Sequence, residues 1–302
     1  YSFISTFNTR CTLAQRGKNK QGRSNLRQVN YALFCSKDNH IPLYFDVYQG
    51  NKHDSKEFYQ VIPKFKSAFQ QHVRANSQIT LVFDKGNNSP ENIREVEENG
   101  FHYVGSLKLN EHPDLCELSS QDEKFKDFNH PRLSQMKAYR LKKHLYDSQR
   151  TLVVTFNKNL YQDQLKTIHH DIEKCQVQLS QLSQRLQDRS EGLITKGIKP
   201  TRGSVEKNIQ DILKRQFMKK IFTIEYHEKN NVPLISYQVN HQAYSHLLDT
   251  YLGKKILFTN NHHWSTEDII LAYHSQHIIE NIFKELKDRD NGCWWPLNHW
   301  TD

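Results

Sequence analysis

Residues 79–88 read Ile-Thr-Leu-Val-Phe-Asp-Lys-Gly-Asn-Asn, and this stretch decides the fold class. Its first five residues form the continuous, largely apolar run that is typical of a strand buried inside a sheet. The run ends abruptly at Asp84, and the residues after it favour a turn. Ser89 and Pro90 then supply a cap and a first-turn proline, which predict a helix from about Pro90 to Asn99. A strand, a turn and a helix in this order indicate an α/β fold.

The residues on either side continue the alternation of strands and helices. Tyr31–Ser36 and Leu43–Tyr48 are rich in strand-forming residues and are joined by a polar turn, so they predict an antiparallel hairpin. A helix follows with Asp54 or Ser55 as its cap, because the next apolar residues recur at spacings of four, three and four. Tyr103–Leu107 returns as a strand. The apolar stripe of the helix consists of Phe58, Ile62, Phe65 and Phe69.

The pattern changes between about residues 110 and 255. Residues 138–146 and 151–156 predict a hairpin of strands, and a long helix follows it. The apolar residues of that helix alternate by three and four over three heptads, which is the spacing of a coiled-coil seam. A second apolar series in residues 205–217 predicts the returning arm of a helical hairpin, and two further strands follow. The seam residues are Leu165, Ile168, Ile172, Cys175, Leu179, Leu182 and Leu186.

These patterns divide the 302 residues into three parts. Residues 1–109 are expected to form the first part of an α/β core. Residues 110–254 are expected to form an insertion of β-hairpins and a long helical hairpin. Residues 255–302 then return to the core with its last strand and a helix that runs from Ser265 or Thr266 to about Lys287.

The composition favours a nucleic-acid partner without requiring one. There are 42 Lys and Arg against 33 Asp and Glu, and the net charge of +9 attracts polyanions. Five cysteines without paired spacing indicate neither a zinc site nor a disulfide framework, which fits a reducing cytosol. No apolar run approaches 18 residues and no signal peptide opens the sequence, so we expect no membrane partner.

Asp84 is the first candidate for chemistry. Two hard cations about 4 Å apart can clamp the attacking and leaving oxygens when a phosphodiester is cut without a protein nucleophile. Mg²⁺ prefers oxygen ligands, so two or three carboxylates from separate elements should gather. Asp84 at the tip of a buried strand is well placed for this, because the strand holds its backbone rigid. The alternative is an aspartate that only initiates a turn.

Glu280 is the second candidate. In one continuous helix, Tyr273, Gln276, Glu280 and Lys287 would share a face, since they are separated by three, four and seven residues. A carboxylate, an amide, a phenol and an ammonium on that face could hold a metal ion and bind phosphate oxygens. The alternative is a solvated helix face with a salt bridge.

Through these residues the sequence resembles the insertion-sequence DDE transposases of the group typified by insertion sequence four. Their signature reads tyrosine, two residues, arginine, three residues, glutamate, six residues, lysine. The chain matches it at Tyr273, Glu280 and Lys287, with Gln276 in place of the arginine. Three blocks of residues in the first hundred, and a closing block, are also similar and follow in the same order. These blocks are 13–17, 49–55, 82–89 and 295–302.

The resemblance implies a fold, a site and a reaction. The fold would be a ribonuclease-H-like mixed sheet with flanking helices, interrupted by the insertion. Asp84 would be the second metal-binding aspartate and Glu280 the third acidic ligand of two Mg²⁺ ions, for which Mn²⁺ could substitute. Tyr273 and Lys287 would contact the phosphates of transposon ends. Gln276 has a neutral amide where the family has the planar, positively charged guanidinium of arginine. This change should loosen the positioning of the phosphate without removing a metal ligand.

The first aspartate of the family is expected on the opening strand, and this sequence has no acid before Asp38. We therefore expect that aspartate upstream of Tyr1, together with an amino-terminal DNA-binding part. Without the first ligand, metal affinity and the two-metal geometry should suffer.

A basic segment between the first two strands could contact the DNA backbone. It has no acidic neighbours, so it would add affinity that depends on salt and not on sequence. The alternative is a solvated loop. The segment contains Arg16, Lys18, Lys20, Arg23 and Arg27.

The resemblance accordingly implies a transposase catalytic domain, truncated at both ends, that would cut transposon ends and join them to target DNA in the bacterial cytoplasm, at the nucleoid. The alternatives are an inactive remnant that binds DNA or oligomerises through residues 165–186, and a metal-dependent nuclease without joining activity.

Overall fold

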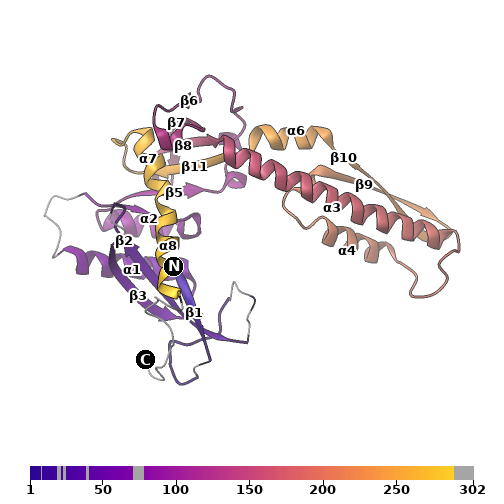
Figure 1. Cartoon of the computed structure of the whole chain (residues 1–302), viewed down its shortest axis with the longest axis horizontal. Coiled ribbons are helices and arrows are strands. Elements are labelled where there is room, and N and C mark those ends of the chain that lie inside the picture. Colours follow the sequence, from indigo (N-terminus) through magenta and orange to yellow (C-terminus); the bar gives the residue numbers. More distant parts are fainter. Residues whose placement is uncertain (8, 19–21, 23–24, 39–40, 71–77, 289–302) are drawn as a thin grey trace. The chain divides into compact units, whose positions relative to one another are not determined.

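A computed structural model describes the chain except for residues 8, 19–21, 23–24, 39–40, 71–77 and 289–302 (Figure 1). The chain forms two compact units. The first unit contains residues 1–112, 138–154 and 255–302, and the second contains residues 113–137 and 155–254. The predicted division at residues 109 and 254 stays a prediction.

An antiparallel sheet opens the first unit. Its strands β1 (Ser2–Thr6), β2 (Arg27–Cys35) and β3 (Pro42–Gln49) lie in the order β1-β2-β3, so the predicted hairpin is confirmed. Helix α1 (Asp54–Gln70) follows, and its predicted apolar stripe is buried at Phe58, Ile62 and Phe65. Asp54 or Ser55 was expected to cap this helix, but both lie within it. Asp54 is in the first turn, where its carboxylate accepts a 2.6 Å hydrogen bond from the Tyr48 hydroxyl.

A mixed sheet carries the strand that decided the fold class. Strand β4 (Thr80–Val82) pairs in parallel with β5 (His102–Leu107), and β5 pairs antiparallel with β11 (Lys254–Thr259). Strands β8 (Ser148–Asn157) and β7 (Met136–Leu145) follow β11 in the sheet. Helix α2 (Pro90–Glu98) connects β4 to β5 and starts at its predicted cap, Ser89. The α/β class is confirmed, and the mixed sheet is compatible with a ribonuclease-H-like core.

The predicted last helix is interrupted. Helix α7 (Thr266–His274) ends at Ser275, and α8 (Gln276–Lys287) begins directly after it. The Ser275 hydroxyl donates a 2.6 Å hydrogen bond to the Ala272 carbonyl, and its backbone N–H donates to the same oxygen. A serine that bonds the preceding turn in this way competes with the regular helical hydrogen bonds. The prediction of one unbroken helix was therefore wrong, because the helix is interrupted at Ser275.

The second unit is built on the predicted long helix. Helix α3 (Lys158–Ser190) lies beside α4 (Arg202–Ile212) and the hairpin of β9 (Phe222–Lys229) and β10 (Val232–Val239) (Figure 1). Two helices were not predicted, α5 (Met218–Ile221) and α6 (His241–Thr250). The remaining elements are η1 (Lys85–Asn87), η2 (Leu109–Glu111), η3 (Pro113–Leu115), β6 (Lys126–Asp127) and η4 (Pro131–Leu133).

The seam of α3 is covered within the chain. All seven seam residues belong to the core of the second unit, where Cys175 and Leu179 are fully buried. Ile209 of α4, Ile235 of β10 and Leu247 of α6 complete that core. The seam face therefore packs against its own neighbours within the chain, and oligomerisation through residues 165–186 stays a prediction. No helix among the described residues is long and apolar enough to cross a membrane.

Candidate active site

Asp84 lies where the chain leaves β4, and its carboxylate is exposed. The residue has extended backbone angles and caps the short helix η1, since Oδ1 accepts a 2.8 Å hydrogen bond from the Lys85 N–H. The turn-initiating role considered for this aspartate is thus present. It does not exclude a metal-binding role, because the carboxyl group remains open to solvent at the strand end.

Buried amides fix the loop that carries Asp84. The Asn88 side chain donates a 2.6 Å hydrogen bond to the carbonyl of Ser106 on β5. Asn92 of α2 donates to the carbonyls of Ser55 and Asn87, at 2.9 and 3.0 Å. The loop is thereby tied to α1, α2 and β5, which supplies the rigid support that a ligand needs.

Tyr273 connects this loop to the end of α7. Its side chain is buried, and its hydroxyl donates a 2.7 Å hydrogen bond to the Ser106 hydroxyl. Burial raises the pKa of Tyr273 above its ordinary value, the Ser106 hydrogen bond opposes this, and the negative charge of Asp84 adds to the increase. The electrostatic effect of Asp84 therefore reaches the phenol of Tyr273.

Glu280 lies between two anchored points of the carboxyl-terminal helices. Tyr273 is anchored to β5 seven residues earlier. Phe283, three residues later, packs edge-on against Tyr31 of β2, with ring centroids 5.3 Å apart. Glu280 itself is exposed. The chain around Glu280 is thus held to β5 on one side and to β2 on the other, and no hydrogen bond or ion pair joins Glu280 to Asp84 within the described residues.

The donor chemistry of the two carboxylates fits a hard divalent cation. Both side chains are exposed and offer oxygen ligands, which Mg²⁺ and Mn²⁺ prefer. Within the part of the chain that the structure describes, no group of three or more His, Cys, Asp or Glu side chains could hold a metal ion. Among the described residues, the candidate metal ligands are therefore the two carboxylates of Asp84 and Glu280.

The expected common face of Tyr273, Gln276, Glu280 and Lys287 is not continuous. The break at Ser275 separates the buried tyrosine from the other three residues. The side-chain nitrogen of Gln276 is buried, without a hydrogen-bond partner among the described residues.

Lys287 is engaged with the first sheet. Its ammonium donates a 2.5 Å hydrogen bond to the Ser2 hydroxyl and lies 5.2 Å from the ring centroid of Phe3. Burial lowers its pKa. This cation therefore does not extend freely into solvent.

Three residues of the basic segment can be located. Arg16 and Lys18 are exposed, which a backbone contact to DNA requires. Arg27 donates a 3.0 Å hydrogen bond to the Ala14 carbonyl and thus supports the loop. Lys20 and Arg23 lie outside the described residues.

Two of the sequence blocks meet in the structure. The backbone N–H of Gly50 donates to the Leu13 carbonyl, and the buried side chain of Gln28 donates a 2.9 Å hydrogen bond to the Gly50 carbonyl. A Cβ on Gly17 would lie 2.0 Å from the Gly50 oxygen, and a Cβ on Gly50 would lie 1.9 Å from the Gln28 oxygen. These two glycines therefore allow the backbone segments around Gly17, Gln28 and Gly50 to pack closely.

Ser106 was missed by the sequence analysis, although it joins Tyr273 and Asn88. The available signal was a single serine in the otherwise apolar and aromatic strand Tyr103–Leu107. A buried hydroxyl needs a partner, so it indicated a polar contact across this strand.

Comparison with known proteins adds one finding. A family model described as a transposase DDE domain matches residues 3–294, which include Asp84 and Glu280 and stop before the closing block 295–302. No curated protein matches the chain.

Proposed function

The chain belongs to the transposase DDE domain family, and from this premise we propose that it cuts phosphodiesters at transposon ends and joins them to target DNA. The reaction would depend on divalent metal ions and would form no covalent protein intermediate. We further assign the chain to the group typified by insertion sequence four. Its partners would be the two DNA substrates and, during transposition, further copies of the chain, at the nucleoid in the bacterial cytoplasm.

Asp84 and Glu280 are the proposed ligands of two Mg²⁺ ions. When bound, such ions activate a water molecule and stabilise the charge that develops on the transferring phosphate. The protein's own contribution is to hold the carboxylates. Asn88 and Asn92 fix the loop of Asp84, and the contact of Phe283 with Tyr31 fixes the helix of Glu280.

One observation carries this proposal within the matched region. The contact between Tyr273 and Ser106, together with the effect of Asp84 on the pKa of Tyr273, supports a site where the Asp84 loop and the end of α7, which leads into the helix of Glu280, face the same sheet edge. Two carboxylates from separate elements at one edge are what a pair of divalent ions needs.

Contacts to DNA phosphates are proposed for the remaining signature residues and the basic segment. Arg16 and Lys18 are exposed and can bind phosphates directly. Lys287 would have to exchange its bond to Ser2 for a phosphate oxygen. The full proposed set is Tyr273, Gln276, Lys287, Arg16, Lys18, Lys20, Arg23 and Arg27.

The test compares Asp84→Ala and Glu280→Ala with wild type in the complete natural protein, using Mg²⁺ and labelled transposon ends. We expect both substitutions to abolish cutting while Glu285→Ala, an exposed acid on the same helix α8, leaves it unchanged. Wild-type cutting by both variants would refute the site.

Joined products distinguish a transposase from a nuclease that only cuts. A wild-type protein that binds the ends with Mg²⁺ but never cuts them would identify the chain as an inactive DNA-binding relative.

A further inference from the structure

The loop between α3 and α4 exposes aliphatic side chains. We call residues 192–200 the tip loop. Leu193 exposes 73% of its surface and Ile198 exposes 97%. A large aliphatic side chain in water does not gain the free energy that its burial would provide. The exposure of Ile198 is therefore a candidate for a binding role.

The tip loop has a fixed conformation. Arg189 of α3 donates hydrogen bonds to the carbonyls of Lys196 and Gly197, at 2.8 and 2.6 Å. Gly197 has a φ of +90°, which glycine adopts at little cost. The guanidinium of Arg189 thus holds the backbone of the two residues that precede Ile198, and this fixes the position of Ile198 in the loop.

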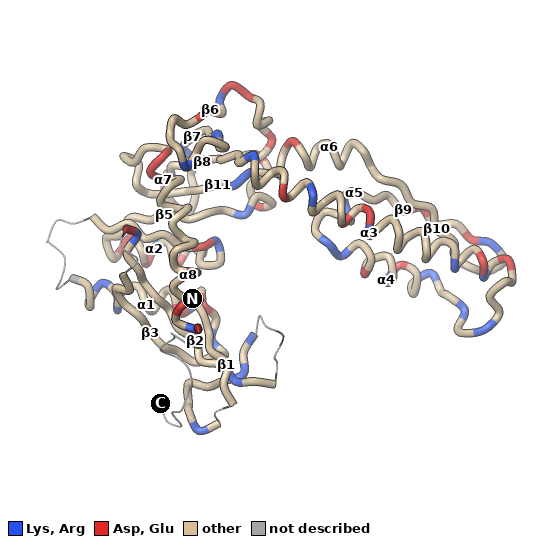
Figure 2. Tube along the Cα trace, viewed as in Figure 1, with Lys and Arg blue, Asp and Glu red and all other residues tan. Residues whose placement is uncertain are grey.

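The tip loop and its surroundings carry positive charge. Between Glu191 and Glu206 the sequence contains Lys196, Lys199 and Arg202 and no acid. Figure 2 shows basic positions, drawn in blue, along the loop that joins α3 to α4. Arg202 pairs with Glu206, whereas Lys196 and Lys199 are exposed and have no ion pair within the described chain. Two free ammonium groups therefore lie on either side of Ile198 in the sequence.

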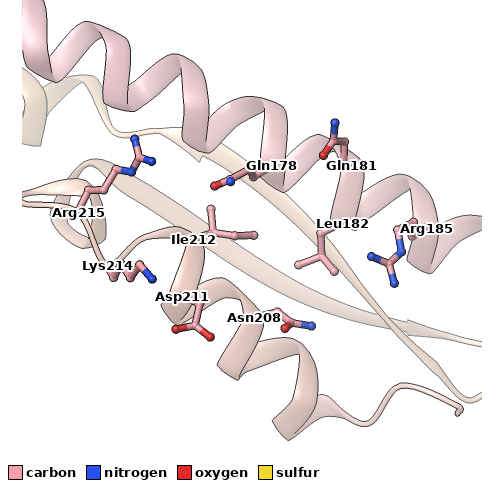
Figure 3. A pocket seen from close by; sticks show the side chains of 9 residues that line it. All are labelled: Gln178, Gln181, Leu182, Arg185, Asn208, Asp211, Ile212, Lys214 and Arg215. Carbon is pink, nitrogen blue, oxygen red and sulfur yellow. The ribbon is translucent and has the colours of Figure 1, made fainter. Parts of the chain in front are cut away.

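Further cations line a groove of about 500 Å³ between the same two helices. Figure 3 shows Arg185 on α3, and Lys214 and Arg215 after α4, at this groove. Arg215 is neutralised by Asp171 at 2.7 Å, and Asp211 also lines the groove. Because acids offset these cations, the groove is a weaker candidate for anion binding than the tip loop.

We propose that the tip loop binds duplex DNA, with Ile198 entering the minor groove against the bases and Lys196 and Lys199 contacting the flanking phosphates. Apolar wedges beside basic side chains are an established way to engage the minor groove. The positive charge without acids favours DNA over a second copy of this basic chain. This inference rests on the proposed function, and it adds a DNA contact in the second unit.

The experiment measures the affinity of the 302-residue chain for a labelled 30-base-pair duplex by fluorescence anisotropy, over a range of salt concentrations. We expect Ile198→Ser to weaken binding about tenfold, which corresponds to about 1.4 kcal/mol, with an unchanged salt dependence. Replacing both Lys196 and Lys199 by Gln should reduce the slope of log affinity against log salt by roughly two. The positions are exposed, so folding should be unaffected, which thermal unfolding checks.

Matched controls lie on α3. Val177→Ser removes another exposed aliphatic side chain and Lys166→Gln another exposed cation, and neither should change DNA affinity. Tip variants that bind DNA like wild type would overturn the inference, while the proposed function would stand if Asp84→Ala still abolishes cutting. A wild-type chain without DNA affinity would overturn the inference, and the cutting assay would still decide the proposed function. Loss of self-association or of vesicle binding in Ile198→Ser, with DNA affinity intact, would also overturn it.

Discussion

The hydroxyl of Tyr273 donates a hydrogen bond to the hydroxyl of Ser106 across 2.7 Å, although 167 residues of sequence separate the two. This contact joins the end of α7 to β5, and the carbonyl of the same serine accepts the amide of Asn88. One buried residue thus connects the helix that leads to Glu280 with the loop that begins at Asp84. The geometry of the proposed site depends on this connection.

Removing either hydroxyl should therefore destabilise the first unit. Tyr273→Phe deletes one net hydrogen bond and should lower the free energy of unfolding by about 1 kcal/mol. Ser106→Ala leaves the buried phenol without its partner and should cost about 1–3 kcal/mol. Urea denaturation of both variants and of the double variant measures the coupling. Additive effects would mean that the two hydroxyls do not interact.

Gly50 should not tolerate a side chain. A Cβ there would lie 1.9 Å from the Gln28 carbonyl oxygen, so Gly50→Ala should lower the free energy of unfolding by about 3 kcal/mol or prevent folding. Gly203→Ala is the control, because a Cβ at this position in α4 meets nothing within 4 Å. It should be neutral or stabilise by up to about 1 kcal/mol. Equal effects of the two substitutions would contradict the packing of Gly50.

The seam of α3 should act within one chain. Leu179→Ala removes a fully buried side chain and should cost about 2–5 kcal/mol, whereas Val177→Ala, at a position that is 57% exposed, should cost little. We also expect the unfolding midpoint to be independent of protein concentration. A midpoint that rises with concentration and loses this dependence in Leu179→Ala would instead assign the seam to an oligomer.

Lys254 should make stability depend on pH. Its ammonium donates to the carbonyls of Cys116, Leu118 and Asp249 at 2.7–2.8 Å, and burial lowers its pKa from the ordinary 10.5 to about 8. Between pH 8 and 10.5 the unfolded chain binds more protons than the folded one, so this residue adds stability as pH rises.

The check is the difference in the free energy of unfolding between wild type and Lys254→Met at pH 7.5 and 9.5. We expect wild type to gain about 1–2 kcal/mol relative to the variant over this interval. The comparison cancels the opposing effect of the buried tyrosines, whose raised pKa values lower stability at higher pH. A difference that stays constant with pH would contradict the lowered pKa.

Apolar periodicity and capping residues predicted those strands and helices whose formation depends on neighbouring residues in the sequence. The run from Ile79 to Phe83, the cap at Ser89 and the seam of α3 each produced the expected strand or helix. The interruption at Ser275 could not be predicted from periodicity, because a serine can extend a helix or bond the preceding turn. Helix α6 was missed because its ends carry polar residues and its apolar series, Ala243, Tyr244, Leu247 and Leu248, spans little more than one turn.

The candidate site was less accessible to sequence reasoning. Asp84 and Glu280 could be named from a strand end and a signature, but the residues that hold them are set by tertiary contacts. Ser106 and Asn88 meet across 18 residues of sequence, and Phe283 meets Tyr31 across more than 250. Contacts between residues so far apart produce no periodic pattern in the sequence. The engagement of Lys287 with Ser2 likewise follows from the docking of α8 on the first sheet.

Whether Asp84 and Glu280 share metal ions can be measured by exchanging Mg²⁺ for Fe²⁺, adding ascorbate and peroxide, and mapping where the radicals formed at the bound iron cut the protein chain. We expect cuts near residue 84 and near residue 280, both suppressed by excess Mg²⁺ and both lost in Asp84→Asn. If Asp84→Asn retained the cut near residue 280, or if only one of the two regions were cut in wild type, the two carboxylates would not hold a common metal site.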